Sequence, residues 1–82
     1  MDGPKLEADL RKETDKWTER IGMEIAKVRL KDPSKKRLLE NVHAYVKDSK
    51  HFMEKGDLIR SFEAIVWAWA WLEILKELKV LE

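Results

Sequence analysis

Signals for a helix boundary occur at only three places in this chain, and they restrict it to a few long helices. The signals are "DGP" at residues 2–4, "KDPSK" at residues 31–35 and "KGD" at residues 55–57. Asp32 can cap a helix that begins at Pro33, where the missing N–H has no helical partner to lose. Gly56 can end that helix in the left-handed conformation, and Asp57 can cap the next one. The sequence therefore predicts three helices, over about residues 4–30, 33–55 and 58–81.

The first two predicted helices are amphipathic, because apolar residues recur at helical spacing along one side of each. These residues are Leu6, Leu10, Trp17, Ile21, Ile25 and Val28 in the first helix, and Leu38, Leu39, Val42, Tyr45, Val46, Phe52 and Met53 in the second. Short connections between long helices favour antiparallel neighbours. The expected fold is all-α, a three-helix up-down-up bundle that forms one domain over residues 1–82.

The third predicted helix differs, because it carries two apolar seams on opposite sides. The first seam consists of Leu58, Phe62, Ile65, Trp69 and Leu72, and the second consists of Trp67, Trp71, Ile74, Leu78 and Leu81. Both have the alternating steps of four and three residues that are typical of helix-on-helix packing. The alternating tryptophans of "VWAWAWL" at residues 66–72 therefore mark the overlap of two helical seams rather than a strand.

We assign the first seam, including Trp69, to the core of the bundle, and we expect the second helix to pack on the small residues Ser61, Ala64 and Ala68. Two neighbours in a bundle need only one broad apolar sector, so the second seam is surplus. Exposed contiguous apolar patches mark interfaces, where tryptophan is enriched. The second seam is therefore a candidate surface for self-association or for a partner. Two alternatives are that the first helix crosses steeply and covers both seams, or that the aromatic rings lie flat on the surface.

Composition argues against a dedicated nucleic-acid or membrane protein. Seventeen Lys and Arg oppose sixteen Asp and Glu, which gives a net charge of +1, and there is no cysteine. The longest apolar run, residues 64–72, is less than half of the roughly 20 residues that a membrane-spanning helix requires. The polar N-terminal segment lacks the basic and apolar regions of a signal peptide. We expect a cytoplasmic protein, and the lack of cysteine and glutamine beside abundant Lys and Glu favours a thermophilic source.

The C-terminal half resembles a family of archaeal proteins, domain of unknown function 357. The resemblance runs from Tyr45 to Leu72 and rests on a tyrosine, an aspartate with a small residue, a phenylalanine, a Gly-Asp pair and an aromatic-rich segment. The matching residues are Tyr45, Asp48, Ser49, Phe52, Gly56, Asp57, Phe62, Ala64, Trp67, Ala68, Trp71 and Leu72. The sequence departs from the family pattern at three positions. Ala70 stands where glycine is usual, Glu73 replaces the usual aspartate, and Ile74 replaces a small residue. The resemblance implies a small helical domain of unknown activity.

A weaker similarity links the same segment to the helical hairpin of a single tetratricopeptide repeat. The residues at comparable offsets are Tyr45, Ser49, Phe52, Gly56, Asp57, Ser61, Ile65 and Ala68. Asp48 stands where that repeat has leucine, and one unit cannot build a solenoid. The similarity implies comparable packing of two helices and nothing more.

No pattern in the sequence supports catalysis or a cofactor. Glu40 with His43, and Asp48 with His51, have the spacing of carboxylate and histidine metal ligands. Both pairs lie on one predicted helix, however, and three of these side chains point away from its apolar side. The chain has no cysteine nucleophile, no G-x-S-x-G and no glycine-rich phosphate loop. We therefore expect surface histidines, no bound metal or cofactor, and no enzymatic activity.

Two aspartates are candidates for structural polar roles. Asp57 is the predicted cap of the third helix, and Asp48 lies at the border of the apolar side of the second. From that border a carboxylate can accept a hydrogen bond from an indole N–H or from a serine hydroxyl of the hairpin.

Five cations crowd the first turn and are the candidate contacts for an anion. They are Arg29, Lys31, Lys35, Lys36 and Arg37, interrupted by Asp32. Lys35 and Lys36 oppose the macrodipole at the start of the second helix, and a bound phosphate would offset that repulsion. No aromatic residue is interleaved for base stacking, so a solvated turn is the default interpretation.

The sequence therefore favours an interaction or oligomerisation module. It would form a homodimer, or bind a protein partner, through the C-terminal half of the third helix. The alternative is an RNA- or nucleotide-associated accessory domain that uses the turn from Arg29 to Arg37.

Overall fold

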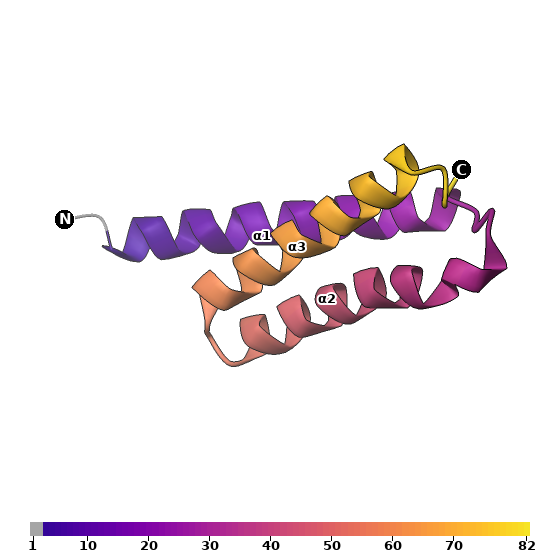
Figure 1. Cartoon of the computed structure of the whole chain (residues 1–82). Helices are drawn as coiled ribbons and strands as arrows, with labels where there is room; N and C mark the ends of the chain where they lie inside the picture. Colours follow the sequence, from indigo (N-terminus) through magenta and orange to yellow (C-terminus); the bar gives the residue numbers. More distant parts are fainter. Residues whose placement is uncertain (1–2) are drawn as a thin grey trace.

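The computed structural model describes residues 3–82, which form three long α-helices and one short 3-10 helix (Figure 1). The elements are α1 (Gly3–Lys27), η1 (Pro33–Lys35), α2 (Lys36–Glu54) and α3 (Leu58–Glu77). The first boundary signal begins at Asp2, which lies outside the described residues. The chain runs along α1, returns along α2 and runs forward again along α3, so the predicted all-α three-helix bundle is confirmed.

The turn between α2 and α3 forms as the sequence predicts. Gly56 has a φ of 76°, in the left-handed region. The N–H of Gly56 donates to the carbonyl oxygen of Met53 at 3.0 Å, and the N–H of Asp57 donates to that of Phe52 at 2.9 Å. This pair of bonds is the Schellman ending of a helix. Asp57 then caps α3, because its Oδ1 accepts a hydrogen bond from the N–H of Arg60 at 3.1 Å.

The end of α3 differs from the prediction, because the helix stops at Glu77 and not at Leu81. Lys79 has a φ of 63°, and the N–H of Val80 donates to the carbonyl oxygen of Leu75 at 3.0 Å. This is a second Schellman ending, with a lysine where glycine is usual. A non-glycine residue in this region is held there by the packing around it.

That packing comes from a pairing between residues 80–82 and the segment that follows α1. Leu81 forms an isolated antiparallel bridge with Leu30, and residues 29–31 and 80–82 share backbone hydrogen bonds of 2.7 to 2.9 Å. α1 ends at Lys27 and is shorter than predicted, and residues 29–31 make these backbone bonds in place of helical ones. Leu81 is only 3% exposed and belongs to the core, so its prediction as an interface residue is wrong.

The three helices are assembled around α3. Its backbone lies close to both α1 and α2, whereas α1 and α2 approach each other much less. Figure 1 shows α3 crossing in front of α1, and the first turns of α1 projecting beyond the turn between α2 and α3. The buried core joins all three helices to the C-terminal segment through Ile21, Val42, Ile65, Ala68, Leu72, Leu75, Val80 and Leu81. With two neighbours, α3 buries more of its circumference than either of the other helices.

Candidate functional site

The side of α3 that faces α2 is built from small residues, as the sequence predicts. Ala64, Ala68 and Ser61 are buried there, together with Ser49 of α2. Each serine hydroxyl donates a 2.7 Å hydrogen bond to the backbone carbonyl oxygen of the other serine, and the two Oγ atoms are 3.1 Å apart. Burying an unpaired hydroxyl is destabilising. The reciprocal bonds therefore let the two helices meet closely without leaving these hydroxyls unpaired.

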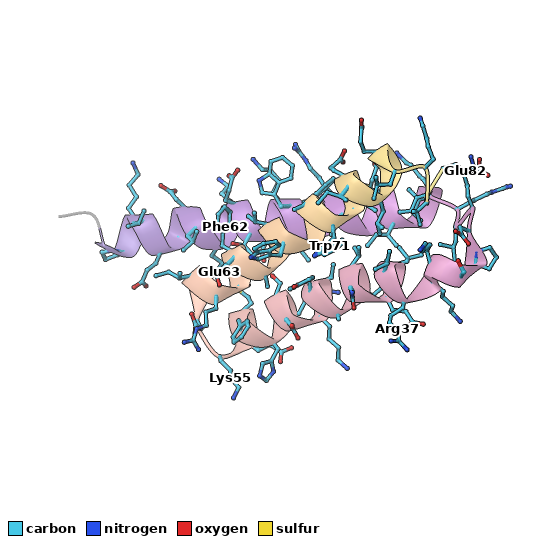
Figure 2. All side chains as sticks on the ribbon, in the orientation of Figure 1. Arg37, Lys55, Phe62, Glu63, Trp71 and Glu82 are labelled. Carbon is cyan, nitrogen blue, oxygen red and sulfur yellow. The ribbon has the colours of Figure 1, made fainter. Side chains whose placement is uncertain are left out.

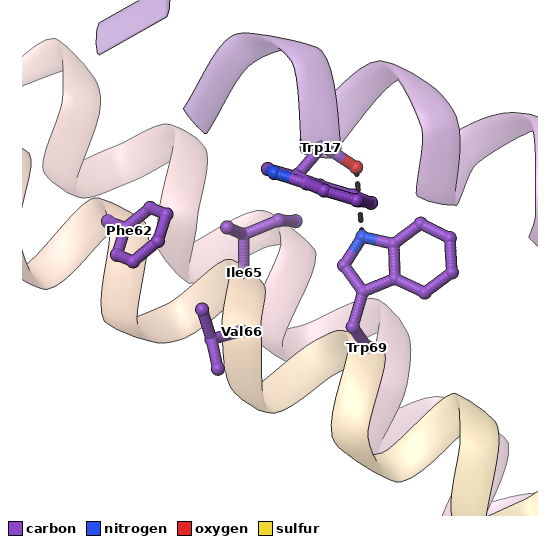
Figure 3. Close-up of a pocket in the computed structure, with 5 residues that line it drawn as sticks. All are labelled: Trp17, Phe62, Ile65, Val66 and Trp69. Carbon is purple, nitrogen blue, oxygen red and sulfur yellow. Dashed lines mark hydrogen bonds between the residues drawn. The ribbon is translucent and has the colours of Figure 1, made fainter. Parts of the chain in front are cut away.

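The side of α3 that faces α1 is held by a pair of tryptophans (Figure 3). The indole N–H of Trp69 donates to the backbone carbonyl oxygen of Trp17 at 3.1 Å, and the two rings meet edge to face with centroids 5.7 Å apart. Further along, the Nζ of Lys76 lies 2.5 Å from Oε1 of Glu24. The hydrogen bond and the charge of Lys76 hold the pKa of the Glu24 carboxyl below its ordinary value. Trp69 packs against the core, so its predicted assignment to the core of the bundle is confirmed.

An apolar groove of about 270 Å³ lies beside the tryptophan pair. It is lined by Trp17, Phe62, Ile65, Val66 and Trp69 (Figure 3). Around Trp17, the Nζ of Lys16 lies 5.3 Å and the Cζ of Arg20 lies 5.0 Å from the ring centroid, while the indole N–H donates to Glu13 at 3.0 Å. The hydrogen bonds from Lys16 and from this indole hold the pKa of the Glu13 carboxyl below its ordinary value. The groove itself can select a ligand only by its shape, since its lining residues are apolar.

Four residues of the second predicted seam lie on the open side of α3, and we call them the outer seam: Trp67, Trp71, Ile74 and Leu78. Trp67 is 53% exposed, Ile74 is 46% exposed and Leu78 is 65% exposed, whereas Trp71 is half-buried. The exposure of Ile74 and Leu78 is inconsistent with the alternative in which α1 covers both seams. Tyr45 of α2 stacks on Trp67 with ring centroids 6.4 Å apart. The outer seam is therefore an apolar edge that the chain itself covers only in part.

Asp48 does not make the hydrogen bond that the sequence suggests. Its side chain is exposed, and the bond to a serine of the hairpin is made by its neighbour Ser49. One residue corresponds to a rotation of about 100° around a helix, and Ser49 follows the buried Val42 by two turns. Our sequence reasoning missed the inward orientation of Ser49, and also the buried Thr14, whose hydroxyl donates to the carbonyl oxygen of Leu10 at 2.8 Å. A spacing of seven residues from a core position, Val42 or Ile21, was the signal that could have found both.

The five cations of the first turn are all exposed, as expected for a solvated turn. The ion pairs within residues 3–82 involve Lys16, Arg60 and Lys76 but none of these five. Asp32 accepts hydrogen bonds from the hydroxyl of Ser34 at 2.6 Å and from its N–H at 3.0 Å, which hold the pKa of the Asp32 carboxyl below its ordinary value. The start of a helical segment favours negative charge, and here the carboxylate of Asp32 already supplies it.

Both carboxylate–histidine pairs lie on the surface of α2. His43 and His51 are exposed on α2. Across residues 3–82, no group of three or more His, Cys, Asp or Glu side chains is placed to hold a metal ion. In the same part of the chain, no helix has both the length and the apolar character needed to cross a membrane.

Comparison with known proteins extends the resemblance seen in the sequence. A model of the family described as protein of unknown function (DUF357) matches residues 16–81. The match extends the segment from Tyr45 to Leu72 by residues 16–44, which include the second half of α1, and by residues 73–81. The crystal structure of protein AF1782 from Archaeoglobus fulgidus is similar, with a TM-score of 0.84 and 47% identity over 94% of this chain and 96% of that one. No curated protein matches the chain. The chain thus belongs to the DUF357 family of proteins of unknown function.

Proposed function

We propose that this protein is a helical interaction module that self-associates through the outer seam. One observation carries the proposal: Trp67, Ile74 and Leu78 are exposed along one side of a helix whose other sides already pack against α1 and α2. Contiguous exposed apolar side chains are typical of binding surfaces. Tryptophan is also enriched among the residues that dominate binding energy.

The binding partner that best fits the outer seam is the outer seam of a second copy of the chain. Its steps of four, three and four residues are those by which two helices interdigitate, and a two-fold axis presents the same steps on both sides. The distance from Trp67 to Leu78 is about 16 Å along the helix. A contact centred on so short a seam should bury a surface area near or below roughly 1,200 Å², the lower limit for stable interfaces. We therefore expect a weak homodimer whose population depends on concentration.

Sedimentation from about 1 μM to about 1 mM, a range that brackets weak affinities, tests the proposal. The wild type should shift from monomer to dimer, and Ile74→Lys should remain monomeric because it places a charge in the centre of the contact. Ile59→Lys is the matched control, since Ile59 is an isoleucine of the same helix that is 72% exposed but lies outside the outer seam. A wild type that stays monomeric throughout, or an equal loss of dimer in both variants, would overturn self-association.

The exposed cations of the first turn support a second candidate function, contact with RNA. None of the five takes part in the ion pairs of residues 3–82, so their charge is available to phosphate groups. Titration with mixed-sequence RNA at several salt concentrations tests this function, because each phosphate contact steepens the salt dependence of binding. Lys35→Gln with Lys36→Gln should weaken binding more than the control Lys50→Gln with Lys55→Gln. The absence of binding at low ionic strength would remove this candidate.

A further inference from the structure

A cleft between α2 and α3 combines aromatic rings with carboxylates. Its volume is about 370 Å³, and its lining includes the rings of Tyr45, Phe52 and Trp67 and the carboxylates of Asp48 and Glu63. Figure 2 shows Glu63 on the part of α3 that follows the turn from α2. The small side chain of Ala64 also lines the cleft, where a larger residue would fill it. The cleft therefore offers two kinds of group that attract positive charge.

The aromatic wall of the cleft comes from both helices. The rings of Tyr45 and Trp67 are nearly parallel, with an interplanar angle of 21° and centroids 6.4 Å apart. About half of the surface of Trp67 remains open to a ligand. The faces of aromatic rings carry negative electrostatic potential and attract a cation that comes within about 6 Å of the ring centroid. A neutral ligand of the same shape gains only the apolar part of this contact.

The carboxylates stand on the two helices that form the cleft, Asp48 on α2 and Glu63 on α3. The ion pairs found within residues 3–82 include neither of them. Arg60 also lines the cleft, and its Nε lies 3.6 Å from the carboxylate of Asp57, with which it pairs. Two carboxylates against one arginine leave the lining with a net negative charge.

We propose that this cleft binds an organic cation through an alkylammonium group. The group would come either from a lysine side chain of a partner protein or from a small quaternary ammonium compound. Aromatic faces beside carboxylates attract both kinds of group. A quaternary ammonium is large and weakly hydrated, whereas a lysine side chain brings a compact, strongly hydrated ammonium on an apolar stem. Calcium and magnesium instead require a shell of about six or more oxygen ligands, and an anion would be repelled by both carboxylates. The cleft shares Trp67 with the outer seam, but it forms within one copy of the chain, and Ile74 and Leu78 lie outside it.

Titration with choline and with its neutral isostere 3,3-dimethyl-1-butanol tests the charge requirement. The full-length protein is followed at constant ionic strength by the NMR signals of the Trp67 indole N–H and of the Tyr45 ring. Choline should shift both signals and bind at least about twofold to fivefold more tightly than the isostere, the factor expected of an exposed cation–π contact. Equal binding of the two compounds, or no shift with choline, would overturn the proposal.

A third titration, with Nα-acetyl-lysine amide, separates the two sources of the group. Tighter binding of the lysine compound favours a protein partner, and tighter binding of choline favours a small molecule. Both results support the alkylammonium site. At a protein concentration where the wild type is monomeric, the same titrations in the Ile74→Lys variant should give unchanged affinities, which separates this site from the proposed dimer.

Conservative variants test the role of the two carboxylates. Glu63→Gln and Asp48→Asn should each weaken choline binding by about twofold to fivefold, whereas Arg60→Gln should strengthen it because a competing cation is removed. Glu77→Gln is the matched control, since it removes an exposed carboxylate of α3 that does not line the cleft. If Glu63→Gln and Asp48→Asn bind choline as tightly as the control, the proposed site is wrong.

Discussion

The inner and outer sides of α3 use the same residue types in opposite ways. On the inner side, Leu72 is fully buried and the indole N–H of Trp69 is bonded to α1. On the outer side, Leu78 and Trp67 are exposed over more than half of their surfaces. The difference shows that hydrophobicity alone does not decide which leucine or tryptophan is buried, because two neighbouring helices cover only part of a third. The inner residues should therefore determine folding stability, and the outer residues should be available for binding.

The largest expected contrast is between two leucines of the same helix. Leu72→Ala leaves a cavity in the core and should reduce the free energy of unfolding by about 3 kcal/mol. Leu78→Ala removes an exposed side chain and should change it by less than about 0.5 kcal/mol. Urea denaturation of both variants measures the contrast. Similar losses in the two would mean that the outer seam also stabilises the monomer.

The serine pair tests how the inner side tolerates polar atoms. Ser49→Ala and Ser61→Ala should each reduce the free energy of unfolding by about 1 kcal/mol, because each removes a buried hydrogen bond between α2 and α3. The double variant should lose less than the sum of the two, since the serines bond to each other. Ser34→Ala, at an exposed serine, is the control and should have a small effect. Strictly additive losses would contradict the idea that the two hydroxyls act as one unit.

The two tryptophans give a smaller contrast that separates folding from binding. Trp69→Phe removes the hydrogen bond to Trp17 and should reduce the free energy of unfolding by about 1 kcal/mol. Trp67→Phe keeps a ring stacked on Tyr45 and should change it by less than about 0.5 kcal/mol. Thermal or urea unfolding measures both values at a concentration where the protein is monomeric. An equal loss in both variants would show that Trp67 belongs to the folded core.

The sequence predicts the helices well where the signal is local. Gly56 lacks a Cβ and takes the left-handed conformation that ends α2, and the carboxylate of Asp57 accepts the hydrogen bond that caps α3. The end of α3 could not be predicted, because no local signal marks Lys79 as a left-handed residue. Its conformation follows from the pairing of Leu81 with Leu30, which are far apart in the sequence.

The distinction between local sequence signals and contacts across the fold also applies to the candidate sites. The exposure of Ile74 and Leu78 follows from helical spacing, which the sequence contains. The inward position of Ser49 follows from the same spacing, because Ser49 lies seven residues after the buried Val42, and our choice of Asp48 overlooked it. The cleft, in contrast, is hidden in the sequence, since the stacking of Tyr45 on Trp67 is set by how α2 and α3 slide along each other.

The smallest expected effect is electrostatic, and it concerns the contact between α1 and α3. Glu24 and Lys76 are 32% and 30% exposed, and their pairing lowers the pKa of the Glu24 carboxyl in the folded state. A carboxyl whose folded pKa lies below its unfolded value of about 4.5 stabilises the fold above that pH. The stabilisation is lost as the pH falls through the folded pKa.

The difference in unfolding free energy between the wild type and Glu24→Gln should therefore be constant near neutral pH and shrink below about pH 4.5. Urea denaturation at a series of pH values measures it. The pKa values of Glu13 and Asp32 are also lowered, so their protonation at acid pH destabilises both proteins. This effect is the same in the wild type and the variant and cancels in the difference. A difference that stays constant at acid pH would mean that the pair does not join α1 to α3 in solution. The inner side of α3 would then be held to α1 chiefly by the tryptophan pair.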